Sequence, residues 1–478
     1  MSLETNPAIE TVPVVSKAER YPPQVKYIIW NEVCERFSYY GMMGILENYL
    51  SNRMAMGADG ATEVLHLFGT AVYFLPLLGG WLADRWLGRY WTILSISLFY
   101  CLGHGTLAMF EGSQGGLFVG LLLLAIGAGG IKPCVSAFVG DQFRTDQQHL
   151  LTKVYGWFYW AINLGAAAAF FIIPTVKIHS GYRWAFGIPG IAMAVATLAF
   201  WSGTKYYVRQ PPSAREEKRT RFFPVLWYAL LRLGRRKAGG KFLDVALERY
   251  SLEEVEAARA VVGILVIFAS VPMFWALFNQ VNSTWVVQGD LMRPLTLFGG
   301  QWQLNGETMQ GSGAVLVMIW VPILTLGIYP LFERLGWRPT ALRRMSAGML
   351  FAAVAFVISG MLQSRLDGGQ TLSILWQLVP YIVLEAGEVT LSATALEFAF
   401  DQAPKQLKSI IMSFWLMTIA GGHFLIAAFT GLNERFVHAK GASEFYFYAV
   451  LMLVVAGIFI LCAMRYRAPS HQPSAISY

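Results

Sequence analysis

Ionisable and aromatic residues with helical spacing lie near the start of the chain and are its first candidates for chemistry. Glu32, Glu35, Arg36, Tyr39 and Tyr40 stand at positions i, i+3, i+4, i+7 and i+8, which places all five on one stripe of a helix. The surrounding residues are largely apolar, so the stripe must face the protein interior. Two carboxylates beside one guanidinium leave a surplus negative charge that can hold and release a proton. The alternative is an ion pair that only fixes helix packing, for which one carboxylate would be enough.

Two further ionisable residues, Lys132 and Glu388, lie within apolar runs. Lys132 follows the glycine-rich run 127–130, and Glu388 stands in the middle of 381–392. Such residues are expensive inside apolar helices, so each is a functional candidate. Opposite charges on different helices suit the two ends of a zwitterionic solute. The alternative for each residue is an internal ion pair.

His66 is a candidate proton carrier, because imidazole titrates near neutral pH. It lies early in the second apolar run, where a hydrogen bond between helices is an equally good interpretation. The other histidines, including His104 and His423, are interpreted as structural.

Motifs of metal sites and hydrolytic enzymes do not occur in the sequence. The four cysteines have no paired spacing, so neither a disulfide framework nor a metal site is expected. No H-E-x-x-H or G-x-S-x-G arrangement is present either. The sequence therefore predicts no metal, no cofactor and no enzymatic activity.

The elements that position these residues are long apolar helices. Of the 478 residues, 55% are hydrophobic and 14% are charged, whereas soluble domains have about 25% charged residues. The mean hydropathy is +0.47. Runs such as 115–131 and 446–464 are long enough to cross about 30 Å of hydrocarbon. We therefore expect an all-α, polytopic membrane protein.

The hydropathy pattern predicts twelve membrane spans. They lie near 25–51, 61–83, 90–110, 115–139, 154–176, 184–207, 260–286, 312–333, 341–363, 372–399, 407–431 and 444–464. With the amino terminus inside, 28 Lys and Arg residues fall on the inner side and seven on the outer side. This asymmetry predicts that both termini are cytoplasmic.

The spans divide into two sets of six, separated by a charged segment. The predicted parts are a tail (1–24), a first bundle (25–207), a cytoplasmic linker (208–259), a second bundle (260–464) and a second tail (465–478). In the linker, nineteen of fifty-two residues are charged. No cleaved signal peptide is expected at the start.

The net charge of +8 comes mainly from the cytoplasmic loops and the linker. Anionic lipid headgroups are the expected partner of this charge, and nucleic acid is not. Within the linker, 223–237 has the aromatic, leucine-rich and basic composition of a helix on a membrane surface. Ser251 and Glu254 have the spacing of a capping box that opens the seventh span.

A short motif follows the second span at the predicted cytoplasmic face. Its glycines and charged residues resemble the G-xxx-D-R-xx-G-R loop of the major facilitator superfamily, in which glycines permit a tight turn and the charges hold neighbouring helices in one state. The matching residues are Gly80, Asp84, Arg85, Gly88 and Arg89.

Two longer motifs narrow the resemblance to one family. The sequences EVCERFSYYG (32–41) and GAGGIKPCVSAFVGDQF (127–143) resemble those of the bacterial proton-coupled oligopeptide transporters, the POT or PTR family. FYWAINLG (158–165) resembles that family's fifth-helix signature. The resemblance implies a twelve-helix fold in two bundles. It also implies proton-coupled import of di- and tripeptides across a cell inner membrane by symport, with no obligatory protein partner.

The resemblance also implies roles for individual residues. Glu32 and Glu35 would couple protons, with Arg36 and Lys132 pairing with them and binding the peptide carboxylate. Glu388 and Asn163 would bind the peptide's amino end. Aromatic residues would line the cavity and tolerate varied side chains, namely Tyr39, Tyr40, Tyr73, Trp275 and Trp415.

Three positions depart from the family pattern. Met43 stands where many members have an arginine, and Asn279 stands where they have an acidic residue, so this gate pair is neutral here. Val321 replaces a cavity asparagine. We therefore expect proton sensing to rest on the first-helix carboxylates, Glu388 and His66.

Three other functions remain to be compared with peptide transport. A carrier of nitrate or another non-peptide solute would share the fold, but an intact stripe with Lys132 and Glu388 favours a zwitterion. An intramembrane hydrolase lacks its motifs. A channel is disfavoured because no filter motif is repeated and two bundles suit alternating access.

Overall fold

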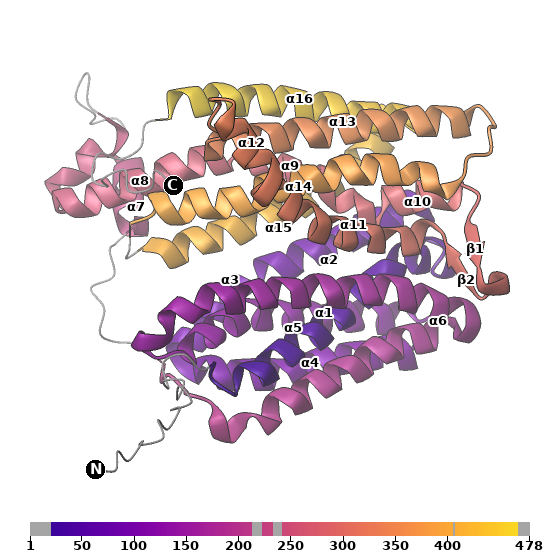
Figure 1. The fold of residues 1–478 in the computed structure, drawn as a ribbon, viewed down its shortest axis with the longest axis horizontal. Helices are drawn as coiled ribbons and strands as arrows, with labels where there is room; N and C mark the ends of the chain where they lie inside the picture. The colour runs from indigo at the N-terminus through magenta and orange to yellow at the C-terminus, as the bar shows by residue number, and fades with distance from the viewer. Residues whose placement is uncertain (1–20, 213–221, 233–240, 405–406, 467–478) are drawn as a thin grey trace, which may run out of the picture.

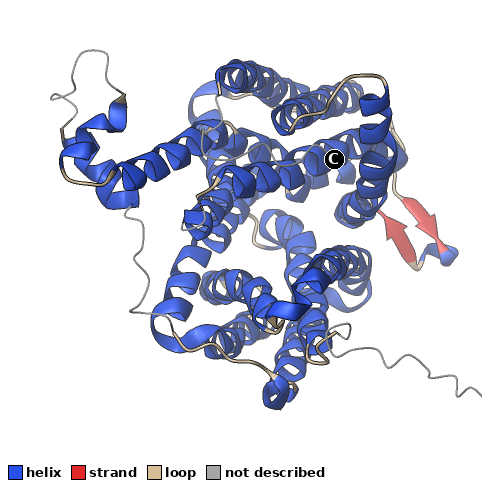
Figure 2. Ribbon diagram, turned by 60° about the vertical axis from the view of Figure 1, so that its left-hand side comes forward, coloured by secondary structure: helices blue, strands red, loops and turns tan. Residues whose placement is uncertain are grey.

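The computed structural model describes residues 21–212, 222–232, 241–404 and 407–466, and most of them are helical. The helices lie along the long axis of the molecule (Figure 1). Two short antiparallel strands, β1 (Leu295–Leu297) and β2 (Trp302–Leu304), form a hairpin at one end, which Figure 2 shows in red.

The described part of the first half, from residue 21 onward, contains helices for six membrane crossings. α2 and α3 form one crossing, joined at Leu75 where Pro76 begins α3. α6 has 52 residues and a kink at Gly181, whose φ is 76°. The segments before and after the kink are each long enough for one crossing. The helices are α1 (Val25–Asn48), α2 (Gly57–Phe74), α3 (Pro76–Leu82), α4 (Gly88–Met109), α5 (Gln114–Asp141) and α6 (Leu151–Ser202).

The second half also contains six crossings, two of which are interrupted. The seventh is broken around Ala269–Ser270, before Pro272, and again at Ser283. The eighth is broken by a π-helical turn after Pro322. The helices are α8 (Leu252–Phe268), α9 (Val271–Phe278), α10 (Thr284–Asp290), α11 (Gly306–Pro322), α12 (Tyr329–Arg334), α13 (Ala341–Asp367), α14 (Leu378–Gln402), α15 (Lys408–Leu432) and α16 (Ala442–Arg465).

Shorter helical turns connect these elements. The 3₁₀ turns are Thr145–Leu150, Thr204–Tyr206, Phe242–Glu248, Asn279–Asn282, Phe298–Gly300 and Ile374–Gln377, and the π turns are Tyr49–Arg53, Ala83–Leu87, Ile323–Ile328 and Asn433–Val437.

The lengths and composition of the helices fit a membrane-spanning chain. In the part that the structure describes, nine helical segments are long and apolar enough to cross a membrane. Two of them, Gly57–Met109 and Lys153–Tyr206, are each long enough for two crossings. α1 is not among the nine because its charged stripe lowers its hydropathy, and it supplies the twelfth crossing. Many large apolar side chains are exposed, including Leu122, Leu198 and Val450, as expected of surfaces in contact with lipid.

The two halves form separate bundles, each with its own core, and they lie side by side (Figure 1). In the first bundle α1 packs along α6, and α4 packs along α5. In the second bundle α13 packs against α14 and α16. Between the bundles, α2 packs along α15, and α6 packs along α11. Residues on these four helices are therefore in a position to form a site between the halves.

In the part of the linker that the structure describes lies a further helix, α7 (Phe222–Leu231). Its Phe222, Val225 and Ala229 are buried against the second bundle, whereas Trp227 is exposed. The helix predicted over 223–237 is therefore present as far as Leu231, whereas 233–237 lies outside the described residues. The predicted capping box is confirmed, since Glu254 N donates to Ser251 Oγ (3.2 Å) and Ser251 N donates to Glu254 Oε2 (3.1 Å).

Close contact between α3 and α5 depends on glycines. A Cβ on Gly79 would lie 2.6 Å from Gly130 Cα and 3.2 Å from Gly129 O on α5. Small residues of this kind let membrane helices approach closely.

We expect Gly79→Ala to destabilise the purified protein by about 1–3 kcal/mol, because the added methyl group forces two backbones apart. The measurement is the unfolding midpoint in detergent. Gly105→Ala is the matched control, since a Cβ at Gly105 meets no atom within 4 Å. Equal midpoints for the two variants would contradict the close approach.

Candidate solute-binding site

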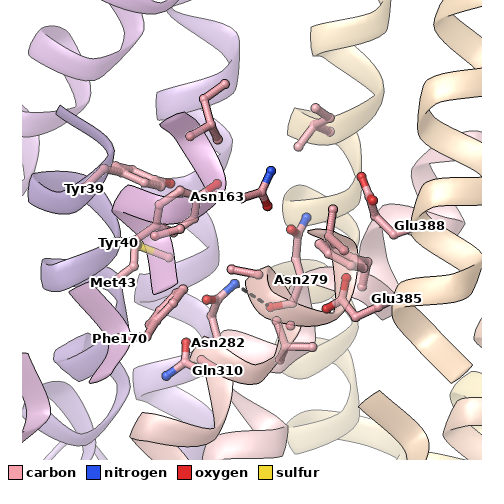
Figure 3. Close-up of a pocket in the computed structure, with 18 of the residues that line it drawn as sticks. Tyr39, Tyr40, Met43, Asn163, Phe170, Asn279, Asn282, Gln310, Glu385 and Glu388 are labelled. Atoms are coloured by element: carbon pink, nitrogen blue, oxygen red, sulfur yellow. Dashed lines mark hydrogen bonds between the residues drawn. The ribbon is translucent and has the colours of Figure 1, made fainter. Parts of the chain in front are cut away.

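A cavity of about 230 Å³ lies between the two bundles. Figure 3 shows its residues reaching in from both halves. The first bundle contributes residues of α1, α2 and α6, and the second contributes residues of α9, the following 3₁₀ turn, α11, α14 and α15. The cavity therefore lies where two bundles that move relative to each other would share a solute.

Most of the predicted substrate-binding residues line this cavity. They are Tyr39, Tyr40, Tyr73, Asn163, Trp275 and Glu388. Trp415 lies behind the wall, with its ring centroid 5.9 Å from that of Trp275. Arg36 is buried and Lys132 is half-buried with a buried Nζ, and neither is among the residues that line the cavity.

The charged stripe on α1 forms one compact cluster. Arg36 Nε lies 2.9 Å from Glu32 Oε1 and 2.6 Å from Glu35 Oε2. Glu35 is fully buried and Glu32 is 3% exposed. One guanidinium thus bridges two carboxylates, as the helical spacing predicts. The cluster carries a net negative charge when both carboxylates are ionised.

Lys132 on α5 is held by aromatic rings. Its Nζ lies 4.2 Å from the ring centroid of Tyr39 and 4.1 Å from that of Tyr73, close enough for cation–π attraction. Among the described residues, Nζ has no hydrogen-bond partner. The expected pairing of Lys132 with the stripe carboxylates is thus replaced by two tyrosine rings, both of which line the cavity.

Glu388 on α14 faces the cavity from the opposite half. Its Oε1 accepts a hydrogen bond from Ser392 Oγ (2.6 Å), and its Oε2 has no partner among the described residues. Asn163 on α6 donates to its own helix, at Tyr159 O (3.0 Å), which leaves its carbonyl oxygen available to a solute.

Sequence reasoning missed a second carboxylate in this wall. Glu385, one turn before Glu388, lines the cavity and is 2% exposed. The available signal was its place three residues before Glu388 in the same apolar run.

Polar residues join the bundles at the end of the molecule that carries the β hairpin. Asn48 Nδ2 donates to Asp290 Oδ2 (2.8 Å) and to Glu307 Oε1 (2.9 Å). Lys177 Nζ lies 2.5 Å from Glu307 Oε2. We call Asn48, Lys177, Asp290 and Glu307 the interbundle seam. Its four residues were not among those predicted to form a site.

His66 belongs to a second contact between the halves. Its Nδ1 is 2.8 Å from Nδ1 of His423 on α15, and its Nε2 is 2.8 Å from Ser283 Oγ. Both histidines are buried, and His423 also lines the cavity. His423, interpreted from the sequence as structural, is therefore part of the site wall and of the contact between bundles.

The motif after the second span forms a tight loop. Gly88 has φ 73°, and a Cβ there would lie 3.3 Å from Gln210 O. Arg89 Nη1 donates to both carboxylate oxygens of Asp141 (2.6 and 2.7 Å), tying α4 to α5. Asp84 and Arg85 are exposed in the preceding turn.

Comparison with known proteins shows the family. The model of the POT family (PTR2) matches residues 90–444. Solute carrier family 15 member 2 of Rattus norvegicus is 35% identical over 367 residues, which are 73% of this chain and 50% of that protein. Solute carrier family 15 member 1 of Homo sapiens is 33% identical over 377 residues, or 73% and 52% of the two chains. The chain spans about half the length of the curated relatives it matches.

Solved structures match over nearly the whole chain. A structure described as an auto-inhibited POT family peptide transporter is 38% identical, with a TM-score of 0.85, and covers 95% of this chain and 99% of that one. The POT family transporter PepTSo is 37% identical, with a TM-score of 0.86, over 94% and 99%. These neighbours are described as transporters, in agreement with the prediction that the chain is not an enzyme. The family model matches most of this chain, and the solved POT structures share the fold over nearly all of it. The chain therefore belongs to the POT family and has that family's twelve-helix fold of the major facilitator superfamily.

Proposed function

We propose that this protein is a proton-coupled symporter that imports di- and tripeptides by alternating access. The observation that carries the proposal is a pair of opposite charges, one on each side of a single cavity, whose Lys132 Nζ and Glu388 Oε2 atoms are buried and have no hydrogen-bond partner among the described residues. Lys132 lies behind Tyr39 and Tyr73, and Glu388 lies in the facing wall. A buried charge is costly unless it is paired. A zwitterionic peptide would supply both missing partners.

We assign the peptide's carboxylate to Arg36 and Lys132, and its amino end to Glu388 and Asn163. The aromatic side chains between them give apolar contact area without fixed hydrogen-bond demands. Such walls accept varied side chains, while the charged residues select the free termini.

We assign proton coupling to Glu32 and Glu35, with Arg36 as their shared partner. When one of these carboxyl groups takes up a proton, its ion pair with Arg36 is lost. The guanidinium of Arg36 then becomes free to bind the peptide's carboxylate. This change of partner would link proton binding and peptide binding through Arg36. His66, at the contact with His423, is proposed as a further proton carrier.

We propose that both termini lie in the cytoplasm and that the protein lies in a cell inner membrane. The Lys and Arg asymmetry supports this orientation. The interbundle seam is then on the outer side, where its polar contacts join the two bundles. We retain the division into bundles at 25–207 and 260–464, with 208–259 as the linker. Residues 1–20 and 467–478 of the two tails lie outside the described residues.

Uptake into liposomes tests the proposed function. Purified protein is reconstituted, and labelled di- and tripeptides are offered with and without an inward proton gradient. Concentrative uptake that requires the gradient supports the proposal. A carrier of nitrate, the main alternative, would accumulate that anion and leave the peptides outside.

The neutral gate positions give a further prediction. Met43 and Asn279 line the same cavity, and Asn279 Nδ2 has no partner among the described residues. A neutral pair cannot form a bridge that protonation breaks. We therefore expect Asn279→Ala to keep at least about half of the proton-driven uptake, a change below 1 kcal/mol, while Glu32→Gln loses it. Loss of driven uptake in Asn279→Ala with exchange preserved would place position 279 in the coupling.

A further inference from the structure

The second carboxylate in the cavity wall has no role in the binding scheme described so far. Glu385 and Glu388 lie on the same face of α14, three residues apart, and both line the cavity (Figure 3). Glu385 is 2% exposed, and its Oε2 has no hydrogen-bond partner among the described residues. A buried carboxylate without a partner is costly, and a cationic ligand in the cavity would stabilise it.

The facing helix leaves room for this carboxylate. Gly313 on α11 also lines the cavity, and a Cβ at that position would lie 2.4 Å from Glu385 Oε1. Any larger residue at 313 would push the carboxylate aside. The position of the Glu385 carboxylate therefore depends on a glycine in the neighbouring helix.

The charges around the cavity are unbalanced on this side. Its described lining residues include two carboxylates and no Lys or Arg. Of the cations nearby, Arg36 is engaged with Glu32 and Glu35, and Lys132 rests on tyrosine rings of the first bundle. An ordinary peptide brings one positive charge to this wall, at its amino end. Two ionised carboxylates would be satisfied by two positive charges.

We propose that Glu385 makes the site selective for peptides whose first residue has a cationic side chain. The inference rests on the proposed function, in which Glu388 binds the peptide's amino end. Three residues of helix advance by about 4.5 Å, so Glu385 lies within reach of the first side chain rather than of the amino group. Lysine, arginine or ornithine at that position would bring its charge to Glu385.

Competition in exchange mode tests the inference, because exchange requires peptide binding and no net proton movement. Liposomes are loaded with unlabelled alanyl-alanine, which exchanges for labelled alanyl-alanine added outside. Three competitors of this exchange are compared, namely lysyl-alanine, norleucyl-alanine and alanyl-lysine. Norleucyl-alanine keeps the four-carbon side chain of lysyl-alanine and lacks its ammonium group, and alanyl-lysine carries the charge on the second residue. We expect lysyl-alanine to compete at about five- to tenfold lower concentration than norleucyl-alanine, as one charge-assisted hydrogen bond permits. Alanyl-lysine should show no such advantage.

Variants assign the selectivity to Glu385. Glu385→Gln keeps the shape and removes the charge, so the ratio between lysyl-alanine and norleucyl-alanine should fall to about one. Glu397→Gln is the matched control on the same helix, since Glu397 is exposed and pairs with Arg344 (3.2 Å) outside the cavity. The control should keep the wild-type ratio. Gly313→Ala keeps the charge but displaces the carboxylate, and it should lower the ratio even if Glu385→Gln yields no folded protein.

The outcomes separate this inference from the proposed function. Exchange of alanyl-alanine with no preference for lysyl-alanine would overturn the inference and leave peptide transport intact. A preference that survives both Glu385→Gln and Gly313→Ala would overturn it as well. If Glu385→Gln keeps the preference in exchange but loses gradient-driven uptake, Glu385 is a proton carrier instead. Failure to exchange any peptide would overturn the proposed function itself.

Discussion

Glu35→Gln is expected to abolish proton-driven accumulation of peptide while leaving peptide-for-peptide exchange measurable. Glu35 is fully buried, and its Oε2 lies 2.6 Å from Arg36 Nε. Glutamine keeps the shape of the side chain but cannot carry the proton, so the solute gradient is no longer linked to the proton gradient. Exchange needs only an occupied carrier and no net proton movement, and it should therefore continue.

The size of this effect follows from the driving force. A pH difference of one unit is worth about 1.4 kcal/mol for each coupled proton, which corresponds to about tenfold accumulation. The wild-type protein should approach or exceed this ratio in liposomes, and the variant should stop near equal concentrations. Labelled dipeptide inside and outside the vesicles gives the ratio directly.

Glu333→Gln is the control, because it makes the same chemical change at an exposed residue of α12. It should accumulate peptide like the wild-type protein. Full accumulation by Glu35→Gln would show that the stripe only fixes the packing of α1, the alternative that the sequence leaves open.

The helices and the stripe could be predicted because both depend on local spacing. Long apolar runs fix the number of crossings, and positions i, i+3 and i+4 bring Glu32, Glu35 and Arg36 together on any helix. The capping box at Ser251 follows from the same short-range rules. Most of the residues that were predicted to bind the solute line the cavity in the structure. They could be predicted because the family motifs place them on facing helices.

The features that could not be predicted depend on tertiary contacts, which local sequence patterns do not encode. Asn48 reaches Glu307, and His66 reaches His423, only because the two bundles meet. Periodicity alone does not distinguish Glu385 from a carboxylate that is paired within its bundle. That distinction depends on Gly313 and on the absence of Lys and Arg from the described residues that line the cavity. Lys132 lies against Tyr39 and Tyr73 because side-chain packing, and not sequence spacing, determines which partner it meets.

Lys132→Ala and Glu388→Ala are expected to weaken peptide binding by about 10- to 100-fold each, the effect of losing one charged hydrogen-bond partner. The two residues lie on opposite halves, so each should act on one end of the peptide. Competition by dipeptides with one blocked terminus separates the two effects. The wild-type protein should bind the free dipeptide more tightly than either the amino-acetylated or the carboxy-amidated form.

In Lys132→Ala, the amidated dipeptide should compete nearly as well as the free one, because the partner of the carboxylate is gone, while acetylation should still reduce binding. Glu388→Ala should show the reverse pattern. Lys153→Ala, at an exposed lysine of α6, is the control and should retain both preferences. The crossed pattern would not arise from general loss of stability, since an unstable carrier loses affinity for all three dipeptides together. If both variants treat the two blocked forms alike, the residues do not bind opposite termini, and the site must hold its solute by other contacts.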